Sequence, residues 1–279
     1  MMFNFLKSVP FVKYLLDIRR ELSLIRFQTT NQTRILQQIY TNAIKAEKIH
    51  EDSFPSKYEH QTFSQNGEDG IILEIFRRIK VAQGTFIEMG TGDGSENNTR
   101  LLLELGWSGT WIDGDSANIL LCKENLRRFT DLNLLTIINS FIDEQNVNTI
   151  LQKLKVPVNV DFLSIDLDLT THVVWEKIDS IKPKVVAIEY NGFFPDSTHW
   201  EAITDKNETW DGSINMGASL STITEISRTK GYKHIGCDLT GTNAFFLLDD
   251  LAQKYFSNLK ENLYEPARPF LNNDAAHQR

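Results

Sequence analysis

The stretch FIEMGTGDGSENN, residues 86–98, places Gly90, Gly92 and Gly94 at alternate positions directly after an apolar run. The apolar run has the pattern of a buried strand, and a helical pattern begins beyond the glycines. Glycine lets the backbone turn sharply and approach a ligand that a Cβ atom would exclude. A strand, a glycine-rich turn and a helix in this order predict a ligand-binding turn in a parallel α/β sheet.

Predicted strands and helices alternate on both sides of this turn. The predicted strands are residues 84–90, 109–115, 133–139, 160–168, 184–191, 232–239 and 242–250. Helical patterns between the first five imply right-handed crossovers and a parallel sheet. The last two are separated only by Thr240 and Gly241, which suits an antiparallel hairpin. The expected fold is therefore α/β, with a doubly wound, Rossmann-like seven-stranded sheet, a terminal antiparallel hairpin and an N-terminal helical extension.

Charge separates an N-terminal arm from an acidic body. Residues 1–50 contain eight Lys and Arg against three Asp and Glu, and the rest of the chain contains 21 against 34. Apolar residues at helical spacing over 11–49 predict one or two helices. Such an arm suits peripheral contact with an anionic membrane surface, self-association, or packing over the protein's own core. The acidic body argues against a nucleic-acid partner.

The expected domains are an arm and linker at 1–55, an α/β domain at 56–265 and a C-terminal tail at 266–279. No run approaches the roughly 18 to 20 apolar residues of a membrane span, and the first residues lack the pattern of a signal peptide. We expect a cytoplasmic protein, which the arm could bring to the inner face of the membrane. The two cysteines, Cys122 and Cys237, are interpreted as reduced packing residues.

The glycine loop departs from the dinucleotide pattern G-x-G-x-x-G because its third glycine comes one residue early. Glu88 precedes the first glycine, where it favours a cationic ligand group and repels phosphate. S-adenosylmethionine (SAM) carries both an ammonium and a sulfonium. Asp113 ends the second predicted strand, where a carboxylate can accept both ribose hydroxyls. These residues predict SAM as the cofactor.

Polar residues also end the fourth and fifth predicted strands. Asp166 and Asp168 end the fourth predicted strand, and Glu189 and Asn191 end the fifth. They are expected near the acceptor, where a carboxylate could act as general base. Alternatively, Asp166, Glu189 and Asn191 could hold Mg²⁺. His172 and His199 are alternative candidate bases because histidine titrates near neutrality.

The glycine loop, the acid on the next strand and the terminal hairpin together resemble class I SAM-dependent methyltransferases. The segments SQNGEDGIILEIF, NNTRLLLELGWSGTWIDGD, FLSIDLD, AIEYN and GYKHIGCDLTGTNAFFL resemble FkbM-type methyltransferases over residues 62–248. That resemblance implies that residues 90–94 line the cofactor loop and that Asp113 holds the ribose. It further implies positions near the adenine for Ser140 and Phe141, and near the methionine end for Gln65 and Glu68. In full, the implied loop residues are Gly90, Thr91, Gly92, Asp93 and Gly94.

FkbM-type enzymes often methylate oxygen in glycan, capsule or natural-product pathways. The expected function is therefore a SAM-dependent O-methyltransferase that acts on a hydroxyl of a sugar, a glycan or a related small-molecule precursor. One alternative is an NAD-dependent oxidoreductase or epimerase, which the early third glycine disfavours. Another is a non-enzymatic scaffold that docks through its arm to a membrane or a partner.

Overall fold

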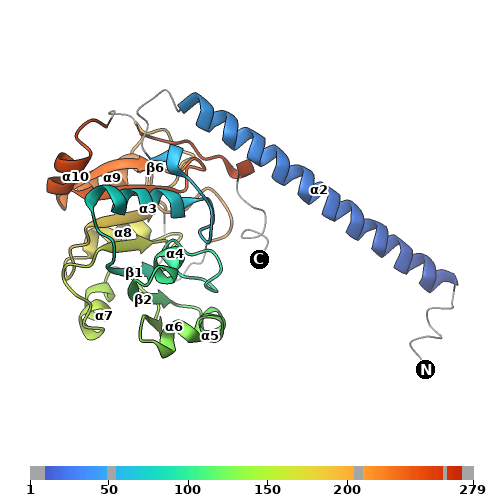
Figure 1. Ribbon diagram of the computed structural model, residues 1–279, viewed down its shortest axis with the longest axis horizontal. Helices are drawn as coiled ribbons and strands as arrows, with labels where there is room; N and C mark the ends of the chain where they lie inside the picture. Colours follow the sequence, from blue (N-terminus) through green and yellow to red (C-terminus); the bar gives the residue numbers. More distant parts are fainter. Residues whose placement is uncertain (1–9, 49–54, 204–209, 260–262, 272–279) are drawn as a thin grey trace. The chain divides into compact units, whose positions relative to one another are not determined.

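The computed structural model describes residues 10–48, 55–203, 210–259 and 263–271. The chain divides into two compact units, Met1–Glu47 and Lys48–Arg279. The described part of the first unit belongs to one 39-residue helix, α2 (Pro10–Lys48) (Figure 1). The sequence predicted one or two helices here, and the structure has one. Among the described residues, no helix is both long and apolar enough to cross a membrane.

The second unit is built on a seven-stranded sheet with the order β3-β2-β1-β4-β5-β7-β6. Its strands are β1 (Thr85–Met89), β2 (Ser108–Asp113), β3 (Leu135–Asn139), β4 (Phe162–Ile165), β5 (Val185–Glu189), β6 (Tyr232–Cys237) and β7 (Asn243–Leu248). Neighbouring strands among β1 to β5 are parallel, and β7 is antiparallel to both β5 and β6. The predicted doubly wound sheet with a terminal hairpin is confirmed.

Helices cover both faces of this sheet (Figure 1). The helices described in this unit are η1 (Ser56–Tyr58), α3 (Glu68–Ile79), α4 (Arg100–Glu104), α5 (Ser116–Asn125), α6 (Arg127–Asp131), α7 (Val147–Lys153), α8 (Thr171–Lys177), α9 (Leu220–Thr229), α10 (Asp249–Tyr255) and η2 (Pro269–Leu271). One core contains buried side chains of α3, α4, α5, α6 and α10, and the other contains those of α7, α8 and α9. Phe162 belongs to the first core and Leu163 to the second, because successive strand residues point to opposite faces.

Helix α3 illustrates why the local sequence forms this element and what it positions. Its first turn carries Glu68 and Asp69, and its last turn carries Arg77 and Arg78. Acids near the N-terminus and bases near the C-terminus both complement the helix dipole. Apolar residues at helical spacing bury one face against the sheet. The packing fixes the first turn, and with it Glu68, at the site described below.

Two segments differ from the sequence-based expectation. The sequence SANILLCKENLRRF, residues 116–129, has the pattern of one helix, but the structure interrupts it at Leu126, which ends α5 and precedes α6. In the segment expected as a tail, 266–279, the amide of Ala267 donates to the carbonyl of Gly192 at 2.8 Å. The first part of that segment is therefore bound to the α/β domain. Residues 272–279 and the linker residues 49–54 lie outside the described part of the chain.

Candidate functional site

The site lies where the strand order reverses, between β1 and β4. In an open α/β sheet, the carboxyl ends of two such strands flank a ligand crevice. Gly90 directly follows β1, with a φ of +82°. A Cβ atom on Gly90 would lie 1.6 Å from the carbonyl oxygen of Asp166, which directly follows β4. Glycine at position 90 thus allows the two strand ends to approach each other.

A crevice of about 270 Å³ opens at this point. Seven of the predicted cofactor residues line it: Gln65, Glu68, Glu88, Gly90, Thr91, Gly92 and Asp93. The remaining lining residues are Ser95, Glu96, Asn97, Asn98, Asp166 and Asn243. Over the whole lining of the described crevice, five side chains are carboxylic acids, and none is Lys, Arg or His. The lining is thus suited to a cationic ligand and unsuited to a pyrophosphate.

Glu88 lies on β1 beneath the glycine loop and is buried. Its carboxylate accepts hydrogen bonds from the amide of Asn98 at 2.9 Å and from the amide of Thr99 at 3.1 Å. The Thr99 hydroxyl donates to it at 2.5 Å. Burial raises the pKa of Glu88 to about 7, although these hydrogen bonds oppose the shift. The side chain therefore both holds the residues before α4 and places an ionisable acid beside the crevice.

Glu68, the first residue of α3, is a second fully buried acid on this wall. It accepts from the amide of Asn66 at 2.8 Å and from the side-chain nitrogen of Asn243 at 2.9 Å. Burial, with the charge of Asp238 adding to it, raises the pKa of Glu68 to about 7. A cation bound in the crevice would favour the ionised form of both acids.

Several buried polar atoms around the crevice have no hydrogen-bond partner within the described residues. They include Oγ1 of Thr91, Oδ1 of Asn97 and Oδ1 of Asn243. Buried polar atoms are normally paired, so these atoms are available to a ligand. Asn97 and Asn243 were not predicted from the sequence. Asn243 begins β7, and an antiparallel strand begins at the edge where its parallel neighbours end; that reasoning could have identified it.

Asp113 ends β2 and supports the glycine loop. Its two carboxylate oxygens accept from the amides of Gly92 and Asp115, both at 2.8 Å. Gly94 serves packing, because a Cβ there would lie 3.0 Å from the sulfur of Cys122 and 3.1 Å from the ring of Trp111. Neither Asp113 nor Gly94 lines the 270 Å³ crevice itself.

Ser140 and Phe141 follow β3 on the side of Asp113. The Ser140 amide donates to the Asp113 carbonyl at 2.9 Å. Phe141 is 68% exposed, and its ring lies beside Gly114, where a Cβ would be 3.2 Å away. An exposed aromatic ring at this edge offers a stacking surface for a flat ligand group.

Three of the predicted catalytic and metal residues form one acidic cluster at the ends of β4 and β5. Asp166, Asp168 and Glu189 each offer a carboxylate oxygen, and these oxygens lie within 4.8 Å of one another. Burial, followed by the charges of Asp166 and Asp168, raises the pKa of Glu189 well above its usual value. Its Oε2 atom is buried without a hydrogen-bond partner in the described chain.

Asp168 has a pKa raised to about 6, first by loss of solvation and then by the charges of Asp166 and Asp113. Its φ of 51° lies in the left-handed region, which a non-glycine residue seldom occupies. Such strain is concentrated at functional sites. This carboxyl group would therefore change its protonation state close to neutral pH.

Asn191 and His172 are placed differently from the cluster. The Asn191 side-chain nitrogen donates to the carbonyls of Ile214 and Met216, at 2.7 and 3.0 Å, and its oxygen accepts from the amide of Phe193. The amide thus fastens the loop that follows β5.

His172 lies in the first turn of α8 and is buried, with Nε2 3.8 Å from Glu201. Burial lowers its pKa, so the imidazole is neutral at pH 7. His172 does not line the cofactor crevice.

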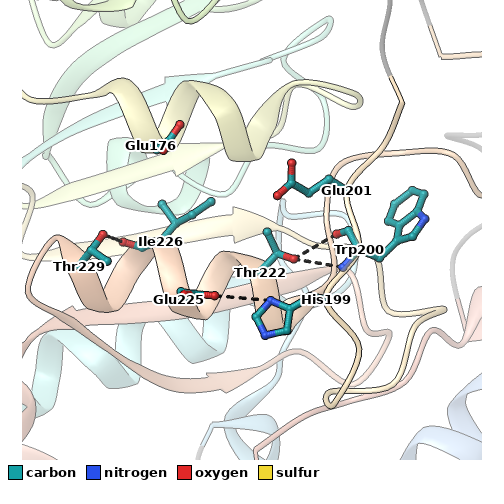
Figure 2. Close-up of a pocket in the computed structure, with 8 residues that line it drawn as sticks. All are labelled: Glu176, His199, Trp200, Glu201, Thr222, Glu225, Ile226 and Thr229. Atoms are coloured by element: carbon teal, nitrogen blue, oxygen red, sulfur yellow. Dashed lines mark hydrogen bonds and ion pairs between the residues drawn. The ribbon is translucent and has the colours of Figure 1, made fainter.

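A larger hollow of about 560 Å³ lies between α8, α9 and residues 199–201 (Figure 2). It is lined by Glu176, His199, Trp200, Glu201, Thr222, Glu225, Ile226 and Thr229. His199 points toward Glu225, with 3.5 Å between Nδ1 and Oε2 (Figure 2). The hollow shares no lining residue with the cofactor crevice. It includes His199, one of the two histidines predicted as alternative bases, which therefore lies away from that crevice.

Comparisons with known proteins were made on sequence and on structure. No protein family profile matches the sequence, and no curated protein matches it. A solved structure of a candidate caffeoyl-CoA O-methyltransferase from Staphylococcus aureus is 16% identical, with a TM-score of 0.42, over 85% of this chain and 98% of that one. A SAM-dependent methyltransferase from Aquifex aeolicus is 11% identical, with a TM-score of 0.38, over 63% and 88%.

A candidate sarcosine dimethylglycine methyltransferase from Galdieria sulphuraria is 15% identical, with a TM-score of 0.39, over 60% of this chain. The chain spans 61% of the length of that protein. The sheet topology is that of a class I methyltransferase fold, and these neighbours are methyltransferases. At such low identities and scores, the conclusion about function depends on the site's own residues.

Proposed function

We propose that this protein is a SAM-dependent O-methyltransferase that acts on a hydroxyl of a sugar, a glycan or a related small-molecule precursor. The observation that carries the proposal is the crevice at the ends of β1 and β4, whose described lining includes five carboxylic acids and no basic residue. A pyrophosphate would meet only like charge there, which disfavours NAD. SAM brings two cationic groups.

The crevice and the strand ends beside it offer a partner for each part of SAM. Glu68 and the unpaired oxygen of Asn243 suit the ammonium group, and the side-chain amide of Gln65, which lines the crevice, suits the methionine carboxylate. The remaining lone pairs of Asp113 suit the ribose hydroxyls, and the exposed ring of Phe141 suits the adenine. When bound, SAM supplies a methyl group on a positively charged sulfur.

The acidic cluster provides the chemistry on the acceptor side. Asp168, with its pKa of about 6, can take the proton of an acceptor hydroxyl near neutral pH. Alternatively, Asp166, Asp168 and Glu189 can hold Mg²⁺, since three carboxylate oxygens within 4.8 Å suit a hard cation. Mg²⁺ would acidify a hydroxyl bound to it. Asn191 is not included in this metal set because its amide is engaged by the loop.

Two sequence features support oxygen as the acceptor atom. The segment SIDLDLTTH after β4 lacks the Asn-Pro-Pro-aromatic pattern common in enzymes that methylate amino groups. The resemblance to FkbM-type enzymes supports a sugar or glycan. The long connection after β5 carries an aromatic pair, Phe194 and Trp200, whose rings stack on each other at 4.2 Å. That pair could form part of a wall for such an acceptor.

Calorimetric titration with SAM, and separately with NAD, tests the cofactor. We expect micromolar binding of SAM and none of NAD; the reverse result would favour the oxidoreductase. Binding of neither would favour the scaffold. Release of S-adenosylhomocysteine is then measured with a panel of sugar acceptors and matched amines, with EDTA or with added Mg²⁺. Turnover that persists in EDTA supports Asp168 as the base, whereas turnover restored only by Mg²⁺ supports the metal. Turnover with amines alone would refute O-methylation.

A further inference from the structure

Apolar residues of α2 repeat with the alternating spacing of three and four that defines a heptad. The a positions are Leu15, Leu22, Thr29, Leu36 and Ala43, and the d positions are Ile18, Ile25, Gln32, Ile39 and Ala46. The register continues without a break over about 48 Å of helix, at 1.5 Å per residue. A strict seven-residue repeat keeps its stripe on a partner when helices supercoil around one another.

This stripe, the a and d positions from Leu15 to Ala46, is uncovered within its own unit. Five of its six large apolar residues, Leu15, Leu22, Ile25, Leu36 and Ile39, are 47 to 65% exposed, and the sixth, Ile18, is half-buried. The described part of that unit is the single helix α2. The large aliphatic side chains lie on both sides of the polar pair Thr29 and Gln32, and a repeated apolar surface of this length indicates a partner that excludes water.

Charges beside the stripe fit a second copy of the same helix. Glu21 occupies a g position and Arg26 the e position of the next heptad. In a parallel, in-register assembly, the g residue of one chain lies beside the following e residue of its neighbour. Within one helix, residues five apart do not face each other, so the two side chains complement each other between chains.

The order of residue types along the stripe indicates how many chains assemble. Leucine occupies three a positions, and isoleucine occupies three d positions. This arrangement shifts coiled coils from dimers toward trimers and tetramers. Tyr14 and Ile35 at g positions widen the apolar surface beyond a and d. A wider surface is buried more completely when each helix contacts two neighbours.

We propose that α2 joins three or four copies of this chain in a parallel coiled coil through the stripe from Leu15 to Ala46. The inference is independent of the proposed methyltransferase activity. It accounts for a 39-residue helix whose apolar stripe is uncovered within its own unit.

The mass of the full chain in solution, measured by light scattering after size exclusion, tests the proposal. We expect three or four times the 32.0 kDa of one chain. A mass of one chain overturns the proposal. The stripe would then cover the α/β domain or bind a membrane, and binding to phosphatidylserine vesicles would distinguish these two cases. A mass of two chains overturns the assignment from leucine at a and isoleucine at d.

Leu22→Asp and Leu24→Asp form a matched pair, because both leucines are exposed on α2 and differ in heptad position. We expect Leu22→Asp at position a to dissociate the assembly and Leu24→Asp at position c to leave the mass unchanged. The thermal unfolding of the α/β domain serves as the folding control for both variants. Equal effects of the two substitutions would overturn the assigned register.

Charge reversal tests the parallel arrangement. Glu21→Arg should raise the dissociation constant about tenfold, since each interface then gains a like-charge pair. Adding Arg26→Glu should restore it. Likewise, Ala43→Cys should form disulfide-linked chains on mild oxidation, because equivalent a positions face each other only in a parallel assembly. The matched control Arg34→Cys, at an outer position, should not. Failure of both the rescue and the Ala43→Cys crosslink overturns the parallel arrangement.

Discussion

Alanine substitutions at Gly90 and Gly92 separate the two reasons for which this loop contains glycine. Both residues have positive φ, +82° and +52°. At Gly90 a Cβ would lie 1.6 Å from the carbonyl oxygen of Asp166, whereas at Gly92 it would meet no atom within 4 Å. The two variants therefore share the conformational cost and differ in the steric one.

The conformational cost of alanine in the left-handed region is about 1 to 2 kcal/mol at each site. Gly90→Ala must also move the end of β4 by more than an ångström, which adds about 2 kcal/mol for overpacking. Loss of the hydrogen bond from the Asp166 amide to the Met89 carbonyl, 3.0 Å in this structure, adds about 1 kcal/mol. At about 2 to 4 °C per kcal/mol for a domain of this size, Gly90→Ala should lower Tm by about 10 °C or more and Gly92→Ala by about 5 °C.

Differential scanning calorimetry and SAM titration provide the assay. Gly92 lines the crevice, so its variant should remain folded while the Kd for SAM rises at least about tenfold, or about 1.4 kcal/mol. In Gly90→Ala the main effect should be the lower Tm. If Gly90→Ala melts within about 2 °C of the unmodified protein, the close approach of β1 to β4 is refuted. Unchanged SAM affinity in Gly92→Ala would remove the loop from the binding site.

Further predictions concern three acids. Asp168→Asn should reduce turnover about 100-fold or more with little change in SAM affinity. The rate of the unmodified enzyme should rise with pH through about 6. A flat pH–rate profile and an active variant would exclude Asp168 as base. Asp113→Ala should weaken SAM binding about tenfold with only a small fall in Tm, as titration and calorimetry can measure; unchanged affinity would exclude its contact with the ribose. Because burial raises the pKa of Glu88 from 4.5 to about 7, the folded state favours the protonated form, and the ligand-free protein should lose about 3 kcal/mol of stability from this group between pH 4.5 and 7. Denaturant unfolding of Glu88→Gln should show a shallower pH dependence over that range, and an unchanged slope would contradict the assignment.

The alternation of strands and helices, the terminal hairpin and the position of the glycine loop were predictable because they depend on local patterns. Alternating apolar runs and helical periods identify the elements, and right-handed crossovers limit how they can be arranged. Polar residues at the ends of β4 and β5 were expected together on the same grounds. The structure brings Asp166, Asp168 and Glu189 within 4.8 Å.

The residues that each polar side chain contacts were harder to predict from the sequence. Asn191 and Glu189 are two residues apart, yet one side chain fastens a loop and the other joins the acidic cluster. That difference depends on Ile214 and Met216, whose carbonyls accept from the Asn191 side chain although they lie more than 20 residues further along the chain. Likewise, Asn243 reaches Glu68 across 175 positions of sequence.

The sequence by itself determined the elements, their alternation and the chemical types at the strand ends, since these follow from local periodicity and from which edge of a parallel sheet a strand end reaches. Only the tertiary structure decided which buried acids share a neighbourhood and how far their pKa values rise. Loss of solvation and the charges of neighbours depend on distances between residues remote in sequence, and a local pattern does not encode those distances.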